Sequence, residues 1–371
     1  MKQARVDVAI ANDPADRSYP IFVDAEPGAA ERFAAELCAR LPDGRIGIVT
    51  DDTVSKLHLP RYADALRGRN RRVTAVVVPD GEGSKSLARA DELCESFARE
   101  GLDRKALVVA LGGGVVGDLA GFVASIFLRG VAYVQVPTTL LAQVDSSVGG
   151  KTGVNLPAGK NLVGTFWQPR LVYTDIGTLQ TLSDRDRASG LAEVIKHAFI
   201  ADAELLAFLE ANTAAVRAGE PEVTAELVAR SCVIKARVVG ADERETTGAR
   251  ALLNFGHTVG HAIESASHKD RDPLRHGEAV ALGMLAAARV HAAETGTASL
   301  EPRLRALLDA VGLPTDVDRR LSAGTLARVA VDKKRGGEHI SFVVVDEPGH
   351  ARLVPLTPAR IHEILLGGKT R

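Results

Sequence analysis

Short apolar runs rich in β-branched residues alternate with helical stretches through the first half of the chain. The apolar runs fall at residues 45 to 50, 73 to 78, 107 to 111 and 131 to 136. The helical stretches fall at about residues 28 to 41, 53 to 68, 86 to 100 and 115 to 128. Apolar strands separated by helices predict a parallel sheet covered on both faces. We therefore expect a Rossmann-like α/β domain over residues 1 to 182.

The pattern changes after about residue 182, where the alternation ends. Alanine-, leucine- and glutamate-rich segments up to about residue 330 predict helices. A later pair of apolar runs, Ile340 to Val345 and Ala351 to Val354, predicts a hairpin. A chain of 371 residues is also too long for one small core. We expect a second, mainly α-helical domain over residues 183 to 371.

Charge and cysteine content exclude several classes of protein. The formal net charge is −1, whereas a general nucleic-acid or membrane-surface binder needs a broad basic excess. Cys38, Cys94 and Cys232 are widely spaced, which is typical of free thiols in a reducing compartment. Acidic residues near the N-terminus and charges within the apolar stretches argue against a signal peptide and a membrane span. We expect a cytoplasmic protein.

Residues 135 to 161 combine hydroxyls, glycines and lysines directly after a predicted strand. Hydroxyls donate to phosphate oxygens, glycines let backbone amides approach an anion, and lysines supply positive charge. One acid in the same segment is expected to be buried. The residues concerned are Thr138, Thr139, Asp145, Lys151 and Lys160. Their order predicts a surface that binds a phosphorylated ligand.

A glycine-rich turn, Leu111 to Asp118, ends a predicted strand and opens a helix, where backbone amides favour a pyrophosphate. Asp51 ends an earlier strand and is placed to bond ribose hydroxyls. The usual Rossmann fingerprint has the glycines first and the acid later, so this order is different. Two alternatives stay open. The glycines could serve only a tight βα turn, and Asp80 to Lys85 could be a helix N-cap instead of a ligand contact.

Histidines cluster in the second half of the chain. His257 and His261 are four residues apart, so they share one face of a predicted helix, and His276 follows. Glu193 lies on a separate predicted helix. Three imidazole or carboxylate ligands with an open position are typical of a catalytic zinc. Two histidines at this spacing, taken alone, more often have a structural role than a metal-binding one. Thr258 also stands where zinc proteases have glutamate.

A local set of basic residues accompanies these candidates. Each alone is most often a solvated surface charge. Lys196 lies one helical turn after Glu193, and Arg250 lies four residues before Asn254. In a chain of near-zero charge this grouping indicates an anionic substrate. The set is Arg129, Lys151, Lys160, Lys196, Lys235, Arg250 and Lys333.

Several motifs resemble those of the 3-dehydroquinate synthases, a family of sugar phosphate cyclases. They include Gly-Gly-Gly-Val-Val-Gly-Asp, Val-Pro-Thr-Thr-Leu-Leu-Ala-Gln-Val-Asp-Ser-Ser-Val-Gly-Gly-Lys-Thr, Gly-Lys-Asn-Leu-Val-Gly, Glu-Val-Ile-Lys-His, Leu-Asn-Phe-Gly-His-Thr-Val-Gly-His and His-Gly-Glu-Ala-Val. They run in order from about Asp51 to Lys334.

The resemblance implies an enzyme that holds NAD and one divalent metal ion, zinc or cobalt. It implies conversion of 3-deoxy-D-arabino-heptulosonate 7-phosphate to 3-dehydroquinate and phosphate. The implied course is transient oxidation, phosphate elimination, re-reduction and aldol closure. A homodimer is implied as well, in which Arg129 reaches the phosphate in the neighbouring subunit.

The resemblance also implies the site residues. The implied metal ligands are Glu193, His257 and His276. The implied cofactor contacts are Asp51, Asp80, Glu82, Lys85, Gly114, Val115, Val116, Gly117, Asp118, Thr138, Thr139, Lys151, Lys160, Thr178 and Thr181. The implied substrate and phosphate contacts are Arg129, Lys151, Asn161, Lys196, Lys235, Arg250, Asn254 and Lys333 or Lys334. The implied catalytic residues are Asp145, Lys151, Lys196, Arg250, Asn254 and His261.

Two departures from the family pattern are visible. Phe127 stands where the family often has tyrosine, and the loop from Glu245 to Arg250 is one residue longer than usual. Three other functions stay open: a related cyclase with another sugar phosphate, a metal-dependent polyol dehydrogenase, and a sugar-phosphate sensor. Asn254, His261 and Lys196 are the dehydroquinate-type residues at positions where related cyclases differ.

Overall fold

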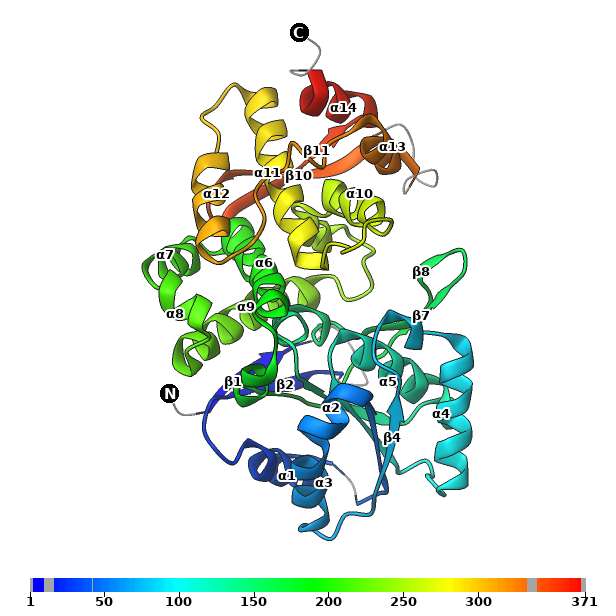
Figure 1. Cartoon of the computed structure of the whole chain (residues 1–371). Coiled ribbons are helices and arrows are strands. Elements are labelled where there is room, and N and C mark those ends of the chain that lie inside the picture. The colour runs from blue at the N-terminus through cyan, green and yellow to red at the C-terminus, as the bar shows by residue number, and fades with distance from the viewer. Residues whose placement is uncertain (1–2, 10–16, 42, 332–338, 368–371) are drawn as a thin grey trace. The chain divides into compact units, whose positions relative to one another are not determined.

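The computed structural model describes residues 3–9, 17–41, 43–331 and 339–367 (Figure 1). Within these residues the chain divides into two compact units. Unit 1 comprises the residues up to Leu182 together with Thr224–Arg244. Unit 2 comprises Ser183–Val223 together with the residues from Glu245 on.

Unit 1 is built on a seven-stranded sheet in the order β1-β2-β9-β6-β5-β3-β4. Its strands are β1 (Ala4–Val8), β2 (Tyr19–Asp24), β3 (Ile46–Asp51), β4 (Val73–Val78), β5 (Leu107–Gly112), β6 (Ala132–Pro137) and β9 (Val172–Asp175). Neighbours from β2 to β4 are parallel, and β1 is antiparallel to β2 at one edge. The predicted Rossmann-like sheet is confirmed, and β3 to β6 match the four predicted runs. The runs did not indicate β1, β2 or β9.

Helices cover both faces of this sheet, as the apolar strands predict. Along β5, Leu107, Val109 and Leu111 pack in a core that includes side chains of α1 (Ala29–Arg40) and α3 (Leu59–Arg67). The intervening side chains, Val108 and Ala110, pack in a second core with α4 (Leu87–Arg99) and α5 (Gly114–Ile126). Because side chains of a strand alternate between its faces, one apolar run supplies both cores.

The helical stretch predicted at about residues 53 to 68 is present, but it is broken at one residue, which was not predicted from the sequence. The structure has two helices there, α2 (Asp52–Leu57) and α3, which meet at His58 with φ −128°. Pro60 stands in the first turn of α3. Proline has no backbone N–H, and its ring clashes with the carbonyl group four residues earlier, here that of Lys56, so it can stand in the first turn of α3 but cannot continue α2.

The segment that carries Lys151 and Lys160 is an antiparallel hairpin of β7 (Lys151–Leu156) and β8 (Gly159–Phe166), separate from the main sheet. The sequence indicated a phosphate-binding segment here but not its strands. The shorter elements of unit 1 are η1 (Glu82–Ser84), η2 (Phe127–Arg129), the π-helical turn η3 (Ala142–Ser146) and η4 (Ile176–Thr181). Helix α9 (Pro221–Ala241) belongs to unit 1 from Thr224 on.

Unit 2 is mainly helical, as predicted, and also contains the predicted hairpin. Its elements are α6 (Asp184–Ala201), α7 (Ala203–Ala211), α8 (Thr213–Ala218), η5 (Ala249–Asn254), α10 (His257–Ser267), α11 (His276–Thr295), α12 (Glu301–Ala310), α13 (Ala323–Val331), β10 (Ile340–Glu347), β11 (His350–Leu356) and α14 (Pro358–Leu366). Helix α11 is buried without a break from Gly277 to Ala288, so neighbours pack around it on every side.

Glycines bring α10 and α11 into backbone contact. A Cβ atom at Gly283 would lie 2.0 Å from the Gly256 carbonyl oxygen, and one at Gly260 would lie 3.0 Å from the Ala279 oxygen. Gly256 caps α10 with φ +80°, in the left-handed region that favours glycine. This close approach sets the position of His257, the first residue of α10. None of the described helices combines the length and the apolar character that crossing a membrane requires.

We expect Gly283→Ala to destabilise the protein by about 1–3 kcal/mol, because its methyl group would force α10 and α11 apart. The free energy of unfolding from urea titrations measures the effect. Gly324→Ala is the matched control, since its added Cβ would lie 3.9 Å from Ser322 Oγ, an ordinary van der Waals contact. Equal stabilities of the two variants would contradict the close contact.

Candidate functional site

In unit 1, several predicted cofactor residues lie where parallel strands end. The strand β5 ends at Gly112, and α5 begins two residues later, so the glycine-rich turn joins a strand to a helix as predicted. No side chain among the described residues caps α5. Its first amides are thus free of a side-chain cap and suit an anion. Thr138 follows β6, its backbone N–H donates to the Gly112 oxygen at 3.0 Å, and its buried hydroxyl has no hydrogen-bond partner among the described residues.

Asp51 ends β3 and is the N-cap of α2. Its Oδ1 accepts hydrogen bonds from the backbone N–H groups of Thr53 and Val54, at 3.0 and 2.8 Å. Burial raises the pKa of this carboxyl group, although the two backbone donors act in the opposite direction. Asp80 accepts a bond from the Thr53 hydroxyl at 3.3 Å. The contact of Asp51 with a ribose stays a prediction.

Lys85 connects three elements of unit 1. Its Nζ lies 2.7 Å from Asp118 Oδ2 on α5 and 2.5 Å from Asn161 Oδ1 on β8. Burial raises the pKa of Asp118, and the ammonium group opposes that shift. Asn155 on β7 donates to Glu82 Oε1 at 2.7 Å and accepts from the Asn161 N–H at 2.8 Å. These bonds gather Glu82, Lys85, Asp118 and Asn161, four predicted site residues.

Asn155 was missed by the sequence analysis, and its position two residues before the Pro-Ala-Gly turn carried no clear signal. The alternative of a helix N-cap at Asp80 to Lys85 is not what the structure has. Ser86 caps α4 instead, by accepting a hydrogen bond from the Arg89 N–H at 3.2 Å.

Gln143 is a second residue that sequence reasoning missed. Its buried side-chain amide donates to the backbone oxygens of Pro137 and Asp175, both at 3.1 Å, and to the Thr178 hydroxyl at 3.2 Å. It thereby holds together the segments that carry Thr138, Thr139, Thr178 and Thr181. The Thr139 hydroxyl accepts from the Ala142 N–H, and the Thr181 hydroxyl contacts His58 at 3.0 Å. A glutamine inside the conspicuous motif was the available signal.

The predicted basic residues of unit 1 differ in burial. Lys235 on α9 is buried, and its Nζ lies 2.7 Å from Asp145 Oδ1. Asp145, which was expected to be buried, is half-buried. Lys151 and Lys160 are exposed on the hairpin. Arg129 is also exposed, at the end of η2, with a left-handed φ of 68°.

In unit 2, Glu193 and two imidazoles come together from three helices. Glu193 lies on α6 with no exposed surface, His257 begins α10 and His276 begins α11. Glu193 Oε1 lies 3.5 Å from Nε2 of each imidazole. Two ligands bound to one zinc ion at tetrahedral angles would be about 3.4 Å apart, given bonds of about 2.1 Å. The spacing therefore fits a single cation.

Two further observations fit a cation at this cluster. Glu193 Oε1 is buried without a hydrogen-bond partner among the described residues, whereas Oε2 forms an ion pair with Lys196. His257 Nδ1 lies 3.2 Å from the Phe255 oxygen, and His276 Nδ1 lies 3.1 Å from Glu264 Oε2. Metal-binding histidines are typically oriented by such a bond at the second ring nitrogen, which turns Nε2 toward the metal. Glu264 was not singled out from the sequence.

The protonation of the cluster without a metal agrees with this interpretation. Burial lowers the pKa of His257 to about 3, which leaves a neutral imidazole. Burial also acts to lower the pKa of His276, but the carboxylates of Glu193 and Glu264 outweigh it and raise this pKa to about 10. Burial alone would raise the pKa of Glu193, whereas Lys196 and the imidazoles bring it well below its usual range. A divalent cation would replace the proton on His276.

His261 lies beside this cluster, with its ring centroid 5.1 Å from that of His257 and 5.9 Å from that of His276. With Glu264 and His276 it forms an overlapping candidate set of ligands. Both sets include His276, so metal ions cannot occupy the two sets independently. The buried Oε1 of Glu193, which faces Nε2 of both His257 and His276, favours the set of Glu193, His257 and His276.

The other predicted site residues of unit 2 differ in their burial and in their contacts. Lys196 is buried and forms an ion pair with Glu193 Oε2, as the one-turn spacing predicts. Arg250 is buried in η5, with its Nε 3.5 Å from Glu245 Oε1. Asn254 is exposed and lines a small pocket. Lys333 and Lys334 lie outside the described residues.

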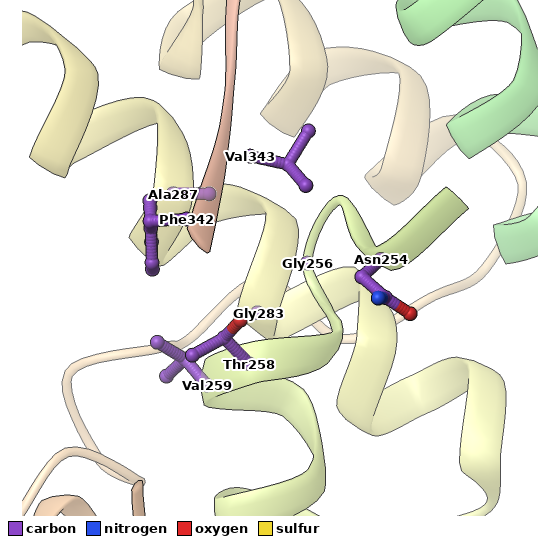
Figure 2. A pocket seen from close by; sticks show the side chains of 8 residues that line it. All are labelled: Asn254, Gly256, Thr258, Val259, Gly283, Ala287, Phe342 and Val343. Carbon is purple, nitrogen blue, oxygen red and sulfur yellow. The ribbon is translucent and has the colours of Figure 1, made fainter. Parts of the chain in front are cut away.

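Figure 2 shows the side chains that line this pocket, which come from η5, α10, α11 and β10 and from Gly256 between η5 and α10. Apart from Asn254 and Thr258, its lining is apolar or glycine: Gly256, Val259, Gly283, Ala287, Phe342 and Val343. It therefore lacks the charged groups that a phosphate would need.

Solved structures share this fold. A 2-deoxy-scyllo-inosose synthase complexed with carbaglucose-6-phosphate, NAD+ and Co2+ is 24% identical, with a TM-score of 0.83 over 98% of this chain and 99% of that one. The 2-epi-5-epi-valiolone synthase from Streptomyces hygroscopicus, with NAD+ and Zn2+ bound, is 29% identical, with a TM-score of 0.80 over 91% and 94%. The dehydroquinate synthase-like fold predicted from the motifs is confirmed.

Comparison with known sequences identifies the family, which is more specific than the fold. The 3-dehydroquinate synthase N-terminal and C-terminal family patterns match residues 75–189 and 190–335. The 3-dehydroquinate synthase of Symbiobacterium thermophilum is 48% identical over 92% of this chain and 94% of its own length. That of Azotobacter vinelandii is 44% identical, with 91% of each chain covered. The chain belongs to the 3-dehydroquinate synthase family.

We expect the protein, once stripped of metal, to bind about one zinc ion per chain, and His257→Ala to bind it at least about tenfold more weakly, because one imidazole is lost. Isothermal titration calorimetry measures both affinities. His268→Ala, which removes an exposed histidine beyond the end of α10, is the control and should bind like the parent. Loss of binding in the control alone would contradict the assignment.

Proposed function

We propose that the protein is a 3-dehydroquinate synthase, a phosphate-eliminating carbon–oxygen lyase (EC 4.2.3.4) of the shikimate pathway. It converts 3-deoxy-D-arabino-heptulosonate 7-phosphate to 3-dehydroquinate and phosphate. The observation that carries the proposal is the match to both halves of the family over residues 75–335, with relatives of that name 43–48% identical over most of the chain. The free cysteines agree with a cytoplasmic enzyme.

The proposed cofactors are NAD and one zinc or cobalt ion. NAD would accept and return a hydride, and the metal ion would acidify the hydroxyl group that is oxidised. The strand ends and the first turn of α5 in unit 1 would hold NAD. Glu193, His257 and His276 in unit 2 would hold the metal ion. We assign NAD binding to residues 1–182 and metal and substrate binding to residues 183–371.

The basic residues would bind the phosphate and stabilise its charge as it leaves. Lys196 already compensates a buried carboxylate, so its ammonium group is held in one place by Glu193. Lys235 is held in the same way by Asp145. Lys151, Arg250 and Lys333 would complete the set. His261 and Asn254 would contact the substrate, and His261 stands next to the metal ligands.

Two other functions are less well supported. Iron-containing alcohol dehydrogenases share the fold, but the one from Thermococcus thioreducens is 15% identical, with a TM-score of 0.67 over 93% of this chain and 97% of that one. A related cyclase that takes another sugar phosphate is nearer, at 24–29% identity. The relatives named 3-dehydroquinate synthase exceed both.

We expect the metal-loaded protein to release one phosphate and form one 3-dehydroquinate per heptulosonate phosphate, with NAD present in catalytic amount. NAD is regenerated in each turnover, so absorbance at 340 nm should not rise with product. Phosphate release and the carbocycle are measured in parallel. Net NADH in proportion to product would refute the scheme, and turnover of glycerol with NAD would favour the dehydrogenase.

We also propose a homodimer. Four large apolar side chains are exposed on neighbouring parts of unit 1: Ile126 at 45%, Leu128 at 40%, Leu162 at 50% and Phe166 at 37%. The hydroxyls of Thr165 on β8 and Ser125 on α5 lie 2.8 Å apart, which brings β8 beside the end of α5. A patch of this kind marks an interaction surface. Arg129 follows Leu128 in the chain, is exposed, and would reach the partner's phosphate.

We expect Leu162→Asp to shift the protein from dimer to monomer in analytical ultracentrifugation, because it places a charge in the apolar patch. Leu353→Asp, at an exposed leucine of unit 2, is the matched control and should leave the mass unchanged.

A further test of the dimer mixes the Arg129→Ala variant with the His257→Ala variant. Each alone should be inactive, and activity should reappear as subunits exchange, since one site then has an intact metal set and its neighbour's arginine. No recovery would contradict action of Arg129 across the dimer.

A further inference from the structure

One face of α6 carries a stripe of polar residues at intervals of four. Arg185, Ser189 and Glu193 follow one another at i, i+4 and i+8, and such positions lie one above the other on a helix. Glu193 is the proposed metal ligand. The other two residues lie about 12 and 6 Å from it along the axis, at a rise of about 1.5 Å per residue.

Each residue of this stripe contacts the start of α11. Glu193 faces His276 Nε2 at 3.5 Å. The Ser189 hydroxyl accepts from the Gly277 N–H at 3.0 Å, and a Cβ atom at Gly277 would lie 1.9 Å from the Ser189 oxygen. The backbones of the two helices therefore touch at the residue next to His276. This contact limits how far His276 can shift away from Glu193.

Arg185 fixes the chain on both sides of His276. Its Nε and one terminal nitrogen donate to the two carboxylate oxygens of Glu278, at 2.6 and 2.8 Å. Its other terminal nitrogen donates to both oxygens of Asp272, at 2.7 and 2.9 Å. Glu278 in turn accepts from the Arg275 N–H at 2.7 Å, which caps α11. One guanidinium group thus joins the loop that enters α11 to the first turn of that helix.

We propose that Arg185 is a positioning residue for the metal site: it holds His276 at the distance from Glu193 that one cation requires. Arg185 touches neither cation nor substrate and acts through Glu278 and Asp272. Five hydrogen bonds from one rigid fork define a geometry that lysine cannot reproduce, although it keeps the charge. The inference rests on the metal-binding part of the proposed function.

The chain contains a matched control. Arg289 on α11 makes the same kind of fork, with two bonds to Glu301 at 2.8 and 2.9 Å and two to Asp318 at 2.9 and 3.0 Å. It lies thirteen residues after His276, about 20 Å along the helix. Arg289→Lys therefore removes similar bonds from the same unit without altering the surroundings of the ligands.

The test compares zinc affinity in Arg185→Lys and Arg289→Lys, by competition of the metal-free proteins with a chromogenic chelator, and the visible spectrum of the cobalt forms. We expect Arg185→Lys to bind zinc about tenfold more weakly and to change the cobalt spectrum, which reports ligand geometry. Arg289→Lys should match the parent in both, even if its stability falls. Asp272→Asn, an exposed change, should have a smaller effect in the same direction as Arg185→Lys.

Unchanged affinity and spectrum in Arg185→Lys would overturn the inference, and so would an equal loss in Arg289→Lys. A parent protein that binds no metal would overturn both the inference and the proposed metal site. A parent that binds zinc but does not release phosphate from the heptulosonate phosphate would contradict only the proposed function, since the metal measurements need neither NAD nor substrate.

Discussion

The buried carboxylate of Glu193 is the constraint on which unit 2 depends. An ionised carboxylate without exposed surface destabilises a fold by several kcal/mol unless positive charge and donors surround it. Lys196 meets one oxygen, and two imidazoles approach the other. The packing nearby serves this arrangement, because glycines bring α10 against α11 and bring α11 against α6 at the helix starts where the histidines lie. A divalent cation would complete the compensation.

The proposed dinucleotide site of unit 1 has a different requirement, because backbone amides and hydroxyls from separate segments must come together at the strand ends. Two buried side chains unite them. Lys85 connects η1, α5 and the β7–β8 hairpin, and Gln143 connects the segments after β6 and β9. Both are polar groups with several partners each, and removing a partner from such a group leaves a buried donor unpaired.

The sequence predicts the central strands and helices well, because β3 to β6 are apolar on both faces and separated by clear helices. It does not reveal β1, whose outward residues are exposed, or β9, which has four residues. The break at His58 could have been read from Pro60. The candidate metal ligands Glu193, His257 and His276 were predicted because the histidines cluster and the family motifs contain all three, but Glu264 and the partners of Arg185 were not singled out. Their contacts join residues 12 and 87–93 positions apart, and tertiary packing alone makes such pairs.

The backbone of the turn before β6 is strained. Leu128, Arg129 and Gly130 all have positive φ, and only the last is a residue that adopts such angles without penalty. Two side chains in left-handed geometry store roughly 1–2 kcal/mol each. Glycine or asparagine would adopt these positive φ angles at a lower cost in free energy. Stability alone therefore does not explain why leucine and arginine stand at these two positions. The bent backbone fixes the point from which the Arg129 side chain leaves the chain, so this backbone has little conformational entropy to lose when a ligand binds.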